Sequence, residues 1–187
     1  IPSAVADHHD PPRLGQGRGG KHDETHPRCQ RGGLKCYHVP TCRALVVDIQ
    51  EKLSRAMFAR EEFIANVQRL VRGARALGVP ILWAEQNPKG LGPTVPEVAG
   101  LLHDLTPISK FSFSCAASES CMLQLRQLAR SHVLVAGIET HVCVYQTAVE
   151  LLEKGYRVEV VADACSSRTL RTNDAINPAS PPPSRCG

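Results

Sequence analysis

The stretch His132-Val-Leu-Val-Ala-Gly-Ile-Glu-Thr-His-Val-Cys143 decides how the rest of the chain is organised. Its first residues, 132–136, form an apolar run that is typical of a buried strand. Residues 144–154 have the apolar spacing of a helix, which Gly155 ends. The stretch therefore predicts a strand that turns tightly into a helix, with a cysteine at the start of that helix.

Cys143 is the residue of this turn that can do chemistry. The first backbone N–H groups of a helix have no partner within it, and the helix dipole favours negative charge there. We therefore expect the Cys143 thiol to ionise more easily than a free thiol, as a nucleophile requires. The alternative is that Cys143 is a small residue buried where the helix packs on the sheet, which is common for free cysteine. The turn alone leaves both interpretations open.

Composition limits the class of protein. A chain of 187 residues with 42% hydrophobic residues suggests one domain with a core, and 4% aromatic residues make that core aliphatic. A net charge of +4 is too small to indicate a nucleic-acid partner. We find neither an apolar run long enough to cross a membrane nor a signal peptide. The eight cysteines form no compact motif, which favours free thiols and a cytoplasmic location.

Both ends of the chain differ from the middle. Residues 1–42 contain five prolines and five histidines and almost no large aliphatic residues, so we predict a disordered or mis-called tail. The spacings between Cys29, Cys36 and Cys42 fit no common zinc motif, although zinc binding stays an alternative for this segment. Residues 169–187 are rich in proline and lack helical or strand periodicity, so we predict a disordered tail there too.

The predicted domain, residues 43–168, begins with an apolar run at 44–50 that is typical of a buried parallel strand. Asp48 lies at the carboxyl end of this strand, the edge where ligands bind in open α/β sheets, although a turn or capping role is equally open. Residues 61–77 have apolar side chains at helical spacing, and residues 79–84 predict a second strand. Strand, helix and strand in this order indicate a right-handed crossover.

The loop after the second predicted strand lies at the same edge of the sheet as Asp48. Residues 85–100 form a long loop rich in glycine and proline, which we predict to be a pocket wall or lid. A short strand at 106–110 ends in Lys110, which is either a solvated surface residue or a cation beside the site. Ser118 or Ser120 caps a helix that runs to residue 130, and residues 157–163 predict a further strand. These elements predict a Rossmann-like α/β fold with a parallel sheet.

Five stretches, in order along residues 44–168, resemble the isochorismatase-like cysteine hydrolases, and most closely the isochorismatase domain-containing branch. They are Val47-Asp-Ile-Gln-Glu-Lys52, Ala84-Glu-Gln-Asn-Pro-Lys-Gly-Leu-Gly-Pro-Thr94, Lys110-Phe-Ser-Phe-Ser-Cys115, Gly137-Ile-Glu-Thr-His-Val-Cys143 and Val161-Ala-Asp-Ala-Cys-Ser-Ser-Arg168.

The resemblance implies a three-layer α/β/α fold and a catalytic triad of Asp48, Lys110 and Cys143. It also implies a cis peptide bond between Ile138 and Glu139, with the backbone N–H groups of Glu139 and Cys143 as the oxyanion hole. Cys143 would attack, Asp48 would accept the thiol proton and return it to the leaving amine, and water would hydrolyse the thioester. The expected reaction is hydrolysis of a C–N bond in a small molecule, in a protein that associates with copies of itself.

Four residues around this triad are predicted to line the substrate pocket: Gln50, Gln86, Phe113 and His141. His141 could also act as a base for the thiol, since Cys–His pairs are common in catalysis. Two residues apart at a helix start, however, the two side chains diverge, which favours a pocket or surface role for His141. We expect the other cysteines of the domain, Cys115, Cys121 and Cys165, to be packing residues, with Cys165 closest to the site.

The chain departs from parts of the family. Nicotinamidases of this superfamily have a metal site after the second strand, where this chain has Glu85-Gln-Asn-Pro88, so we predict no metal and no cofactor. The presence of Cys143 argues against isochorismate as the substrate, because vinyl-ether hydrolysis does not need a thiol. Family members continue past Arg168 into another helix and strand, which we expect to be missing here.

Two hypotheses follow from these observations. The presence of all three triad residues favours a metal-independent cysteine hydrolase. The absence of the expected C-terminal elements favours an inactive or truncated relative that acts as a binding module. A redox protein is a weak third hypothesis, since the chain contains no Cys-x-x-Cys motif.

Overall fold

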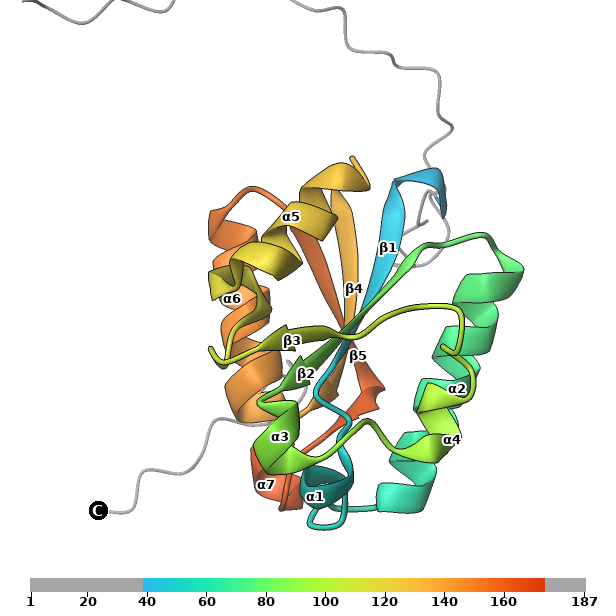
Figure 1. Ribbon diagram of the computed structural model, residues 1–187, viewed down its shortest axis with the longest axis vertical. Coiled ribbons are helices and arrows are strands. Elements are labelled where there is room, and N and C mark those ends of the chain that lie inside the picture. Colours follow the sequence, from blue (N-terminus) through green and yellow to red (C-terminus); the bar gives the residue numbers. More distant parts are fainter. Residues whose placement is uncertain (1–38, 174–187) are drawn as a thin grey trace, which may run out of the picture. The chain divides into compact units, whose positions relative to one another are not determined.

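The computed structural model describes residues 39–173, which form one parallel sheet with helices on both faces (Figure 1). The strands are β1 (Cys42–Val47), β2 (Ile81–Gln86), β3 (Ile108–Lys110), β4 (His132–Ile138) and β5 (Arg157–Ser166). The longer helices are α2 (Arg60–Ala76), α5 (Glu119–Gln127) and α6 (Tyr145–Glu153). The short helical segments are η1 (Val39–Thr41), α1 (Glu51–Ser54), α3 (Pro88–Leu91), α4 (Pro96–Ala99), η2 (Cys115–Ala117), η3 (Thr140–Val144) and α7 (Leu170–Asn173).

The sheet has the strand order β3-β2-β1-β4-β5, and every pair is parallel. The first strand in sequence, β1, is therefore the central one, with Val47 opposite Ala84 of β2 and Gly137 of β4. The carboxyl ends of all five strands face the edge at which α1, α3 and α7 lie in Figure 1. The predicted α/β fold with a parallel sheet is confirmed, and the site must be sought at this edge.

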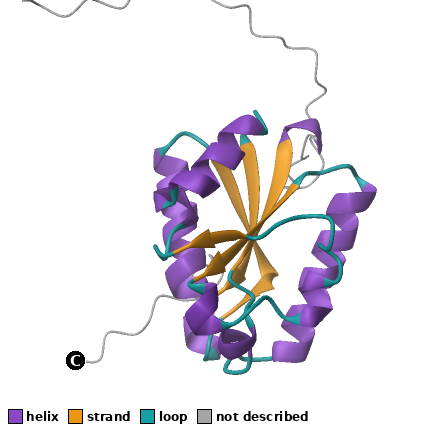
Figure 2. Ribbon diagram, in the orientation of Figure 1, coloured by secondary structure: helices purple, strands orange, loops and turns teal. Residues whose placement is uncertain are grey.

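Alternating side chains of β1 define the two faces of the sheet. Leu45 and Val47 pack in one core with residues of α5 and α6, whereas Val46 packs in the other with residues of α2 and α4. All six residues of β1 are buried, as expected for a strand covered on both sides. Figure 2 shows the resulting three layers, with the strands between two groups of helices.

Several element boundaries differ from the sequence prediction. Strand β2 begins at Ile81, two residues late, because Pro80 has no N–H to donate and contributes only a carbonyl, which accepts from Ala44 N at 2.9 Å. It also runs on to Gln86, so Glu85 and Gln86 belong to the strand. The predicted loop at 85–100 contains the one-turn helices α3 and α4, each with a proline in its first turn.

Other predicted details hold. Helix α5 is capped by Ser118, whose hydroxyl accepts from Cys121 N at 3.5 Å. The five cysteines within residues 39–173 are all free and all buried. No helix in this part of the chain is long and apolar enough to span a bilayer.

The segment after β5 differs from the prediction of a tail without helical structure. Residues 170–173 form the single turn α7, which is too short to show a period in the sequence. It is held by bonds between Thr169 and Thr172, in which the backbone N–H of each donates to the hydroxyl of the other, at 3.3 and 3.2 Å. The predictions for residues 1–38 and 174–187 lie outside the described residues.

Candidate active site

Three strands bring the predicted triad together at the carboxyl edge of the sheet. Asp48 directly follows β1, Lys110 ends β3, and Cys143 lies in η3, the turn after β4. Lys110 Nζ lies 2.6 Å from Asp48 Oδ2, and the Cys143 thiol interacts with the same carboxylate. The predicted catalytic residues are therefore neighbours in space, although 62 positions separate the aspartate from the lysine.

A close backbone approach places the cysteine turn against Asp48. Gly137 has φ of 141°, and a Cβ atom there would lie 2.0 Å from the carbonyl oxygen of Val47. Only glycine can therefore bring the end of β4 so close to the residue that precedes Asp48. One residue further on, the peptide bond between Ile138 and Glu139 is cis, as the family resemblance implies.

The cysteine turn is a π-helical turn, and α6 begins only at Tyr145, two residues after Cys143. Such turns are rare and often occur at functional sites. Only 5% of Cys143 is exposed, and the backbone N–H of Glu139 interacts with its sulfur. One of the two predicted oxyanion donors, the N–H of Glu139, thus lies next to the sulfur that would attack.

Lys110 is a buried cation. The interpretation of this lysine as a solvated surface residue is wrong, because its side chain is completely buried. Besides Asp48, its ammonium donates to Gln86 Oε1 at 3.0 Å and to the carbonyls of Ser112 and Phe113 at 3.1 and 3.0 Å. An ammonium with this many acceptors is held in one position.

Asp48 uses only one of its carboxylate oxygens for conventional hydrogen bonds. Within residues 39–173, Oδ1 has no hydrogen-bond partner of standard geometry, while Oδ2 accepts from Lys110. Burial raises the pKa of Asp48, and the positive charge of Lys110 opposes that shift without cancelling it. The buried carboxylate is therefore a better proton acceptor than an exposed aspartate.

The expectation that the Cys143 thiol ionises easily is wrong. Burial, followed by the negative charge of Asp48, raises the pKa of Cys143 to about 12, against the smaller opposing effects of Lys110 and the Glu139 N–H. A thiol at the exposed start of an α-helix would ionise more easily than a free thiol. In the structure the thiol is buried beside a carboxylate, so it is neutral until a base removes its proton.

The four predicted pocket residues have different roles. Gln50 is buried and ties the loop after β1 to β2, since its amide donates to the carbonyls of Gln86 and Gly92 and accepts from Gln86 N. Gln86 bridges Lys110 and the carbonyl of Phe111, which orients the lysine. Gln50 therefore lies in the scaffold behind the triad, and Gln86 lies in direct contact with it.

The other two predicted pocket residues are exposed. Phe113 is 56% exposed, and its carbonyl holds Lys110. The Nδ1 atom of His141 lies 3.0 Å from the hydroxyl of Ser167, which agrees with a pocket or surface role for His141 and gives no support to a base role. Ser167 lies within one of the five stretches that resemble the family, but nothing in the sequence indicated its contact with His141.

Glu85 lies where the sequence comparison with nicotinamidases led us to expect no metal site. Its Oε1 accepts from the N–H and the hydroxyl of Thr94, at 2.7 and 2.8 Å. Trp83 Nε1 donates to the same hydroxyl at 2.7 Å. This carboxylate therefore fastens the loop between α3 and α4.

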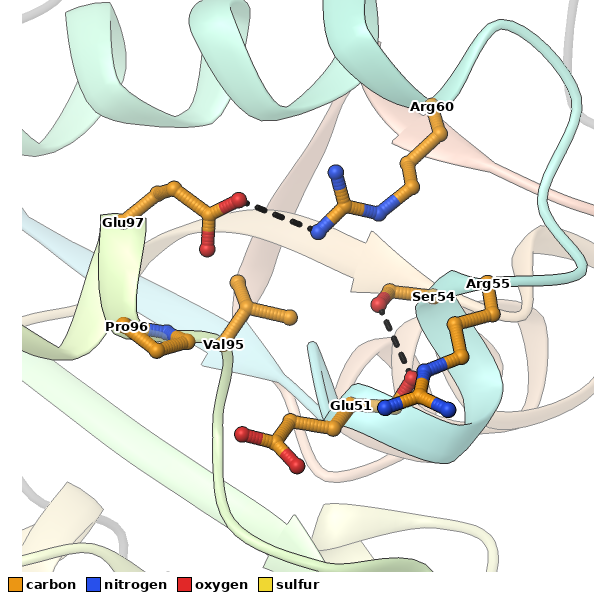
Figure 3. Close-up of a pocket in the computed structure, with 7 residues that line it drawn as sticks. All are labelled: Glu51, Ser54, Arg55, Arg60, Val95, Pro96 and Glu97. Carbon is orange, nitrogen blue, oxygen red and sulfur yellow. Dashed lines mark hydrogen bonds and ion pairs between the residues drawn. The ribbon is translucent and has the colours of Figure 1, made fainter.

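A cavity of about 480 Å³ lies at the same sheet edge but apart from the triad (Figure 3). Within it Arg60 reaches across to Glu97 at 3.1 Å, so these two charges neutralise each other. Its lining residues come from α1, the start of α2 and the start of α4: Glu51, Ser54, Arg55, Arg60, Val95, Pro96 and Glu97. None of the triad residues lines this cavity, so we treat the triad, and not the cavity, as the candidate active site.

The chain is similar to known proteins over most of its described residues. The family model "Isochorismatase domain" matches residues 43–177. Isochorismatase domain-containing protein 2 of Xenopus laevis is 46% identical over 123 residues, which are 65% of this chain and 58% of that protein. The chain thus spans less than two thirds of the length of this curated relative.

Solved structures share the fold. A structure from Caenorhabditis elegans described as MAR1 ribonuclease is 40% identical with a TM-score of 0.66, over 72% of this chain and 69% of that one. The YcaC gene product of Escherichia coli, described as an octameric hydrolase of unknown specificity, is 25% identical with a TM-score of 0.69, over 75% and 72% of the two chains. Because the family model covers most of the sequence and the relatives agree with it, this chain belongs to the isochorismatase family, among the isochorismatase domain-containing proteins.

Proposed function

We propose that this isochorismatase-family hydrolase cleaves the C–N bond of a small amide with Cys143 as the nucleophile. One observation carries the proposal. The buried carboxylate of Asp48 is held by Lys110 through Oδ2, keeps Oδ1 without a conventional partner, and interacts with the Cys143 thiol. This is the relation of nucleophile, base and orienting group that covalent catalysis needs.

In the first step the Cys143 sulfur attacks the amide carbon as Asp48 takes the thiol proton. Because the pKa of the thiol is raised and that of the carboxyl is raised too, proton transfer accompanies attack and no free thiolate precedes it. The carbonyl π electrons move to oxygen, where the backbone N–H groups of Glu139 and Cys143 stabilise the negative charge.

In the second step the tetrahedral intermediate collapses. The C–N bond breaks, the leaving nitrogen takes the proton from Asp48, and a thioester remains on Cys143. Asp48 then accepts a proton from water as the water attacks the thioester. The carboxylic acid leaves, and the proton returns to the sulfur.

Lys110 has an electrostatic and positioning role in this scheme. Its ammonium, fixed by Gln86 and two carbonyls, keeps the carboxylate of Asp48 oriented and lowers the energy of its ionised form. It also stabilises the negative charge as that charge moves from the carboxylate of Asp48 to the oxyanion.

The test is ammonia release from a panel of primary amides by the wild-type chain and by Cys143→Ala. We expect turnover of at least one amide by the wild type, and none by Cys143→Ala. Single-turnover mass spectrometry should find the acyl group on the peptide that contains Cys143. Cys165→Ala is the matched control, since Cys165 is also a buried thiol whose pKa is raised to about 12.

Other outcomes would replace the proposal. Ammonia release that persists in Cys143→Ala would remove Cys143 from the mechanism. Mixed-sequence RNA is included because a relative is described as a ribonuclease. RNA cleavage that disappears in Cys143→Ala would make phosphodiesters the substrate class. Slow, specific binding of an amide without any turnover would favour the binding-module alternative.

A further inference from the structure

The loop that carries the nucleophile, residues 139–143, is held from outside by the segment that follows β5. We call residues 166–173, which are the last residue of β5 and the segment after it, the strap. Three successive side chains of the loop each have a partner in it. Glu139 Oε1 lies 3.2 Å from Arg168 Nε, Thr140 Oγ1 donates to Asn173 Oδ1 at 2.8 Å, and His141 Nδ1 lies 3.0 Å from Ser167 Oγ.

The strap is itself anchored to the scaffold. The hydroxyl of Ser166 donates to the carbonyl of Phe58 at 2.8 Å, and the N–H of Phe58 donates to the carbonyl of Ser167 at 2.8 Å. At its other end the reciprocal bonds between Thr169 and Thr172 close the turn α7. The strap is therefore anchored to the scaffold at its start and closed on itself as a helical turn near its end.

The backbone bonds of the loop itself end on its carbonyl groups, among them those of Glu139 and Thr140. The carbonyl of Glu139 accepts from the N–H groups of Val142 and Val144, at 3.0 and 3.2 Å. The N–H of Glu139 points to the sulfur of Cys143, where the oxyanion of a substrate would form. Bonds within the loop thus fix the carbonyl of Glu139. The strap instead holds the side chains of Glu139, Thr140 and His141, which lie next to the Glu139 N–H in the chain.

We infer that the strap positions the nucleophile loop, with Asn173 as a positioning residue that acts through Thr140. This inference rests on the proposed function of Cys143. Thr140 is completely buried, and its hydroxyl needs an acceptor. Loss of the Asn173 oxygen frees that hydroxyl to seek another partner, which moves the adjacent N–H of Glu139. A displacement of about 1 Å can lower a catalytic rate by about a hundredfold.

The experiment compares Asn173→Ala with two matched variants. Asn173→Asp keeps the Oδ1 acceptor and should behave like the wild type. Arg171→Ala removes an exposed side chain from the same helical turn and should also have no effect. We expect Asn173→Ala to raise hydrogen exchange of the amides of residues 139–144 about tenfold, with the amides of β1 unchanged.

Two further readouts follow the same variants. Iodoacetamide should label Cys143 about tenfold faster at pH 9 in Asn173→Ala, because the loop exposes the thiol more often. For any amide that is turned over, kcat should fall by about 10- to 100-fold with little change in KM, since the oxyanion donors act mainly in the transition state.

The outcomes separate this inference from the proposed function. If the wild type turns over no amide, the proposed function fails, while exchange and labelling still test the strap. Exchange and labelling in Asn173→Ala equal to those in Arg171→Ala would overturn the inference. Faster exchange that is equally large in β1 would also overturn it, because the effect would then be global destabilisation.

Discussion

At the scale of single residues, burial determines the state of the nucleophile. Cys143 lies beside a cation, a backbone donor and the start of a helical segment, all of which favour a thiolate. Desolvation and the charge of Asp48 outweigh them, and the pKa rises to about 12. The resting site therefore holds a thiol and a carboxylate, and the proposed catalysis requires proton transfer between them.

This state makes the stability of the chain depend on alkaline pH. The pKa of Cys143 is higher in the folded chain than its ordinary value of 9.0, so the folded state binds more protons above that pH. The contribution of this thiol to the free energy of unfolding is therefore fully present below pH 9 and is lost as pH rises toward 12. We expect the wild type to lose about 1.4 kcal/mol more than Cys143→Ala between pH 8 and pH 10, measured by urea unfolding.

Cys165→Ala should relieve the alkaline loss to the same extent, since the pKa of Cys165 is also raised to about 12 by burial. It should leave amide turnover intact, whereas Cys143→Ala abolishes it. Equal pH dependence in the wild type and in Cys143→Ala would show that Cys143 ionises near its ordinary value in the folded chain.

At the scale of elements, the ends of the strands carry the site, and the backbone at those ends tolerates few residues. The sheet brings Gly137 of β4 against Val47 of β1, and this contact places the cysteine turn beside Asp48. Asp48 itself has φ of 55°, a left-handed conformation in which aspartate is among the better tolerated residues. Strand ends, rather than helices, thus set the geometry of the triad.

We expect Gly137→Ala to destabilise the chain by more than about 3 kcal/mol or to prevent folding, because its Cβ would overlap the Val47 carbonyl. Urea unfolding measures the effect. Gly73→Ala is the matched control: it lies in α2 with open space around the added Cβ and should raise the free energy of unfolding by about 0.5–1 kcal/mol. A loss below 1 kcal/mol in Gly137→Ala would contradict the role of the close approach.

At the scale of the whole molecule, the triad is an interaction between distant parts of the chain. Asp48 follows β1 and Lys110 ends β3, and these two strands do not pair with each other because β2 lies between them. Their buried ion pair therefore joins the centre of the sheet to its edge. Buried pairs are costly to break because the remaining charge loses its partner.

The effects of substituting Asp48 and Lys110 on the free energy of unfolding should not be additive, because each single substitution leaves the other member of the ion pair without its partner. We expect Asp48→Asn and Lys110→Met each to lower the free energy of unfolding by about 3–5 kcal/mol at pH 7, because each leaves an unpaired buried group. The double variant should be less destabilised than the sum of the two by more than about 1 kcal/mol. Strict additivity in urea unfolding would show that the pair is not coupled.

Local patterns in the sequence were sufficient to predict the type and order of the main elements. Apolar runs and helical spacing are local patterns of residues, so they predicted the strands, helix α2 and the Ser118 cap to within a few residues. Motif order along residues 44–168 also identified the family and named the three residues that the sheet brings together. The predicted element boundaries were wrong near prolines. Strand β2 begins only after Pro80, and the predicted loop contains the one-turn helices α3 and α4, which begin with Pro88 and Pro96.

The burial and the contacts of each site residue follow from the three-dimensional fold. The burial of Lys110, the raised pKa of Cys143 and the scaffold role of Gln50 depend on distances between segments far apart in sequence. The contacts of the strap with the nucleophile loop likewise exist only once β5 pairs with β4. Electrostatic energies and hydrogen bonds depend on separation in space and on desolvation, and neither quantity can be read from the order of residues in the chain.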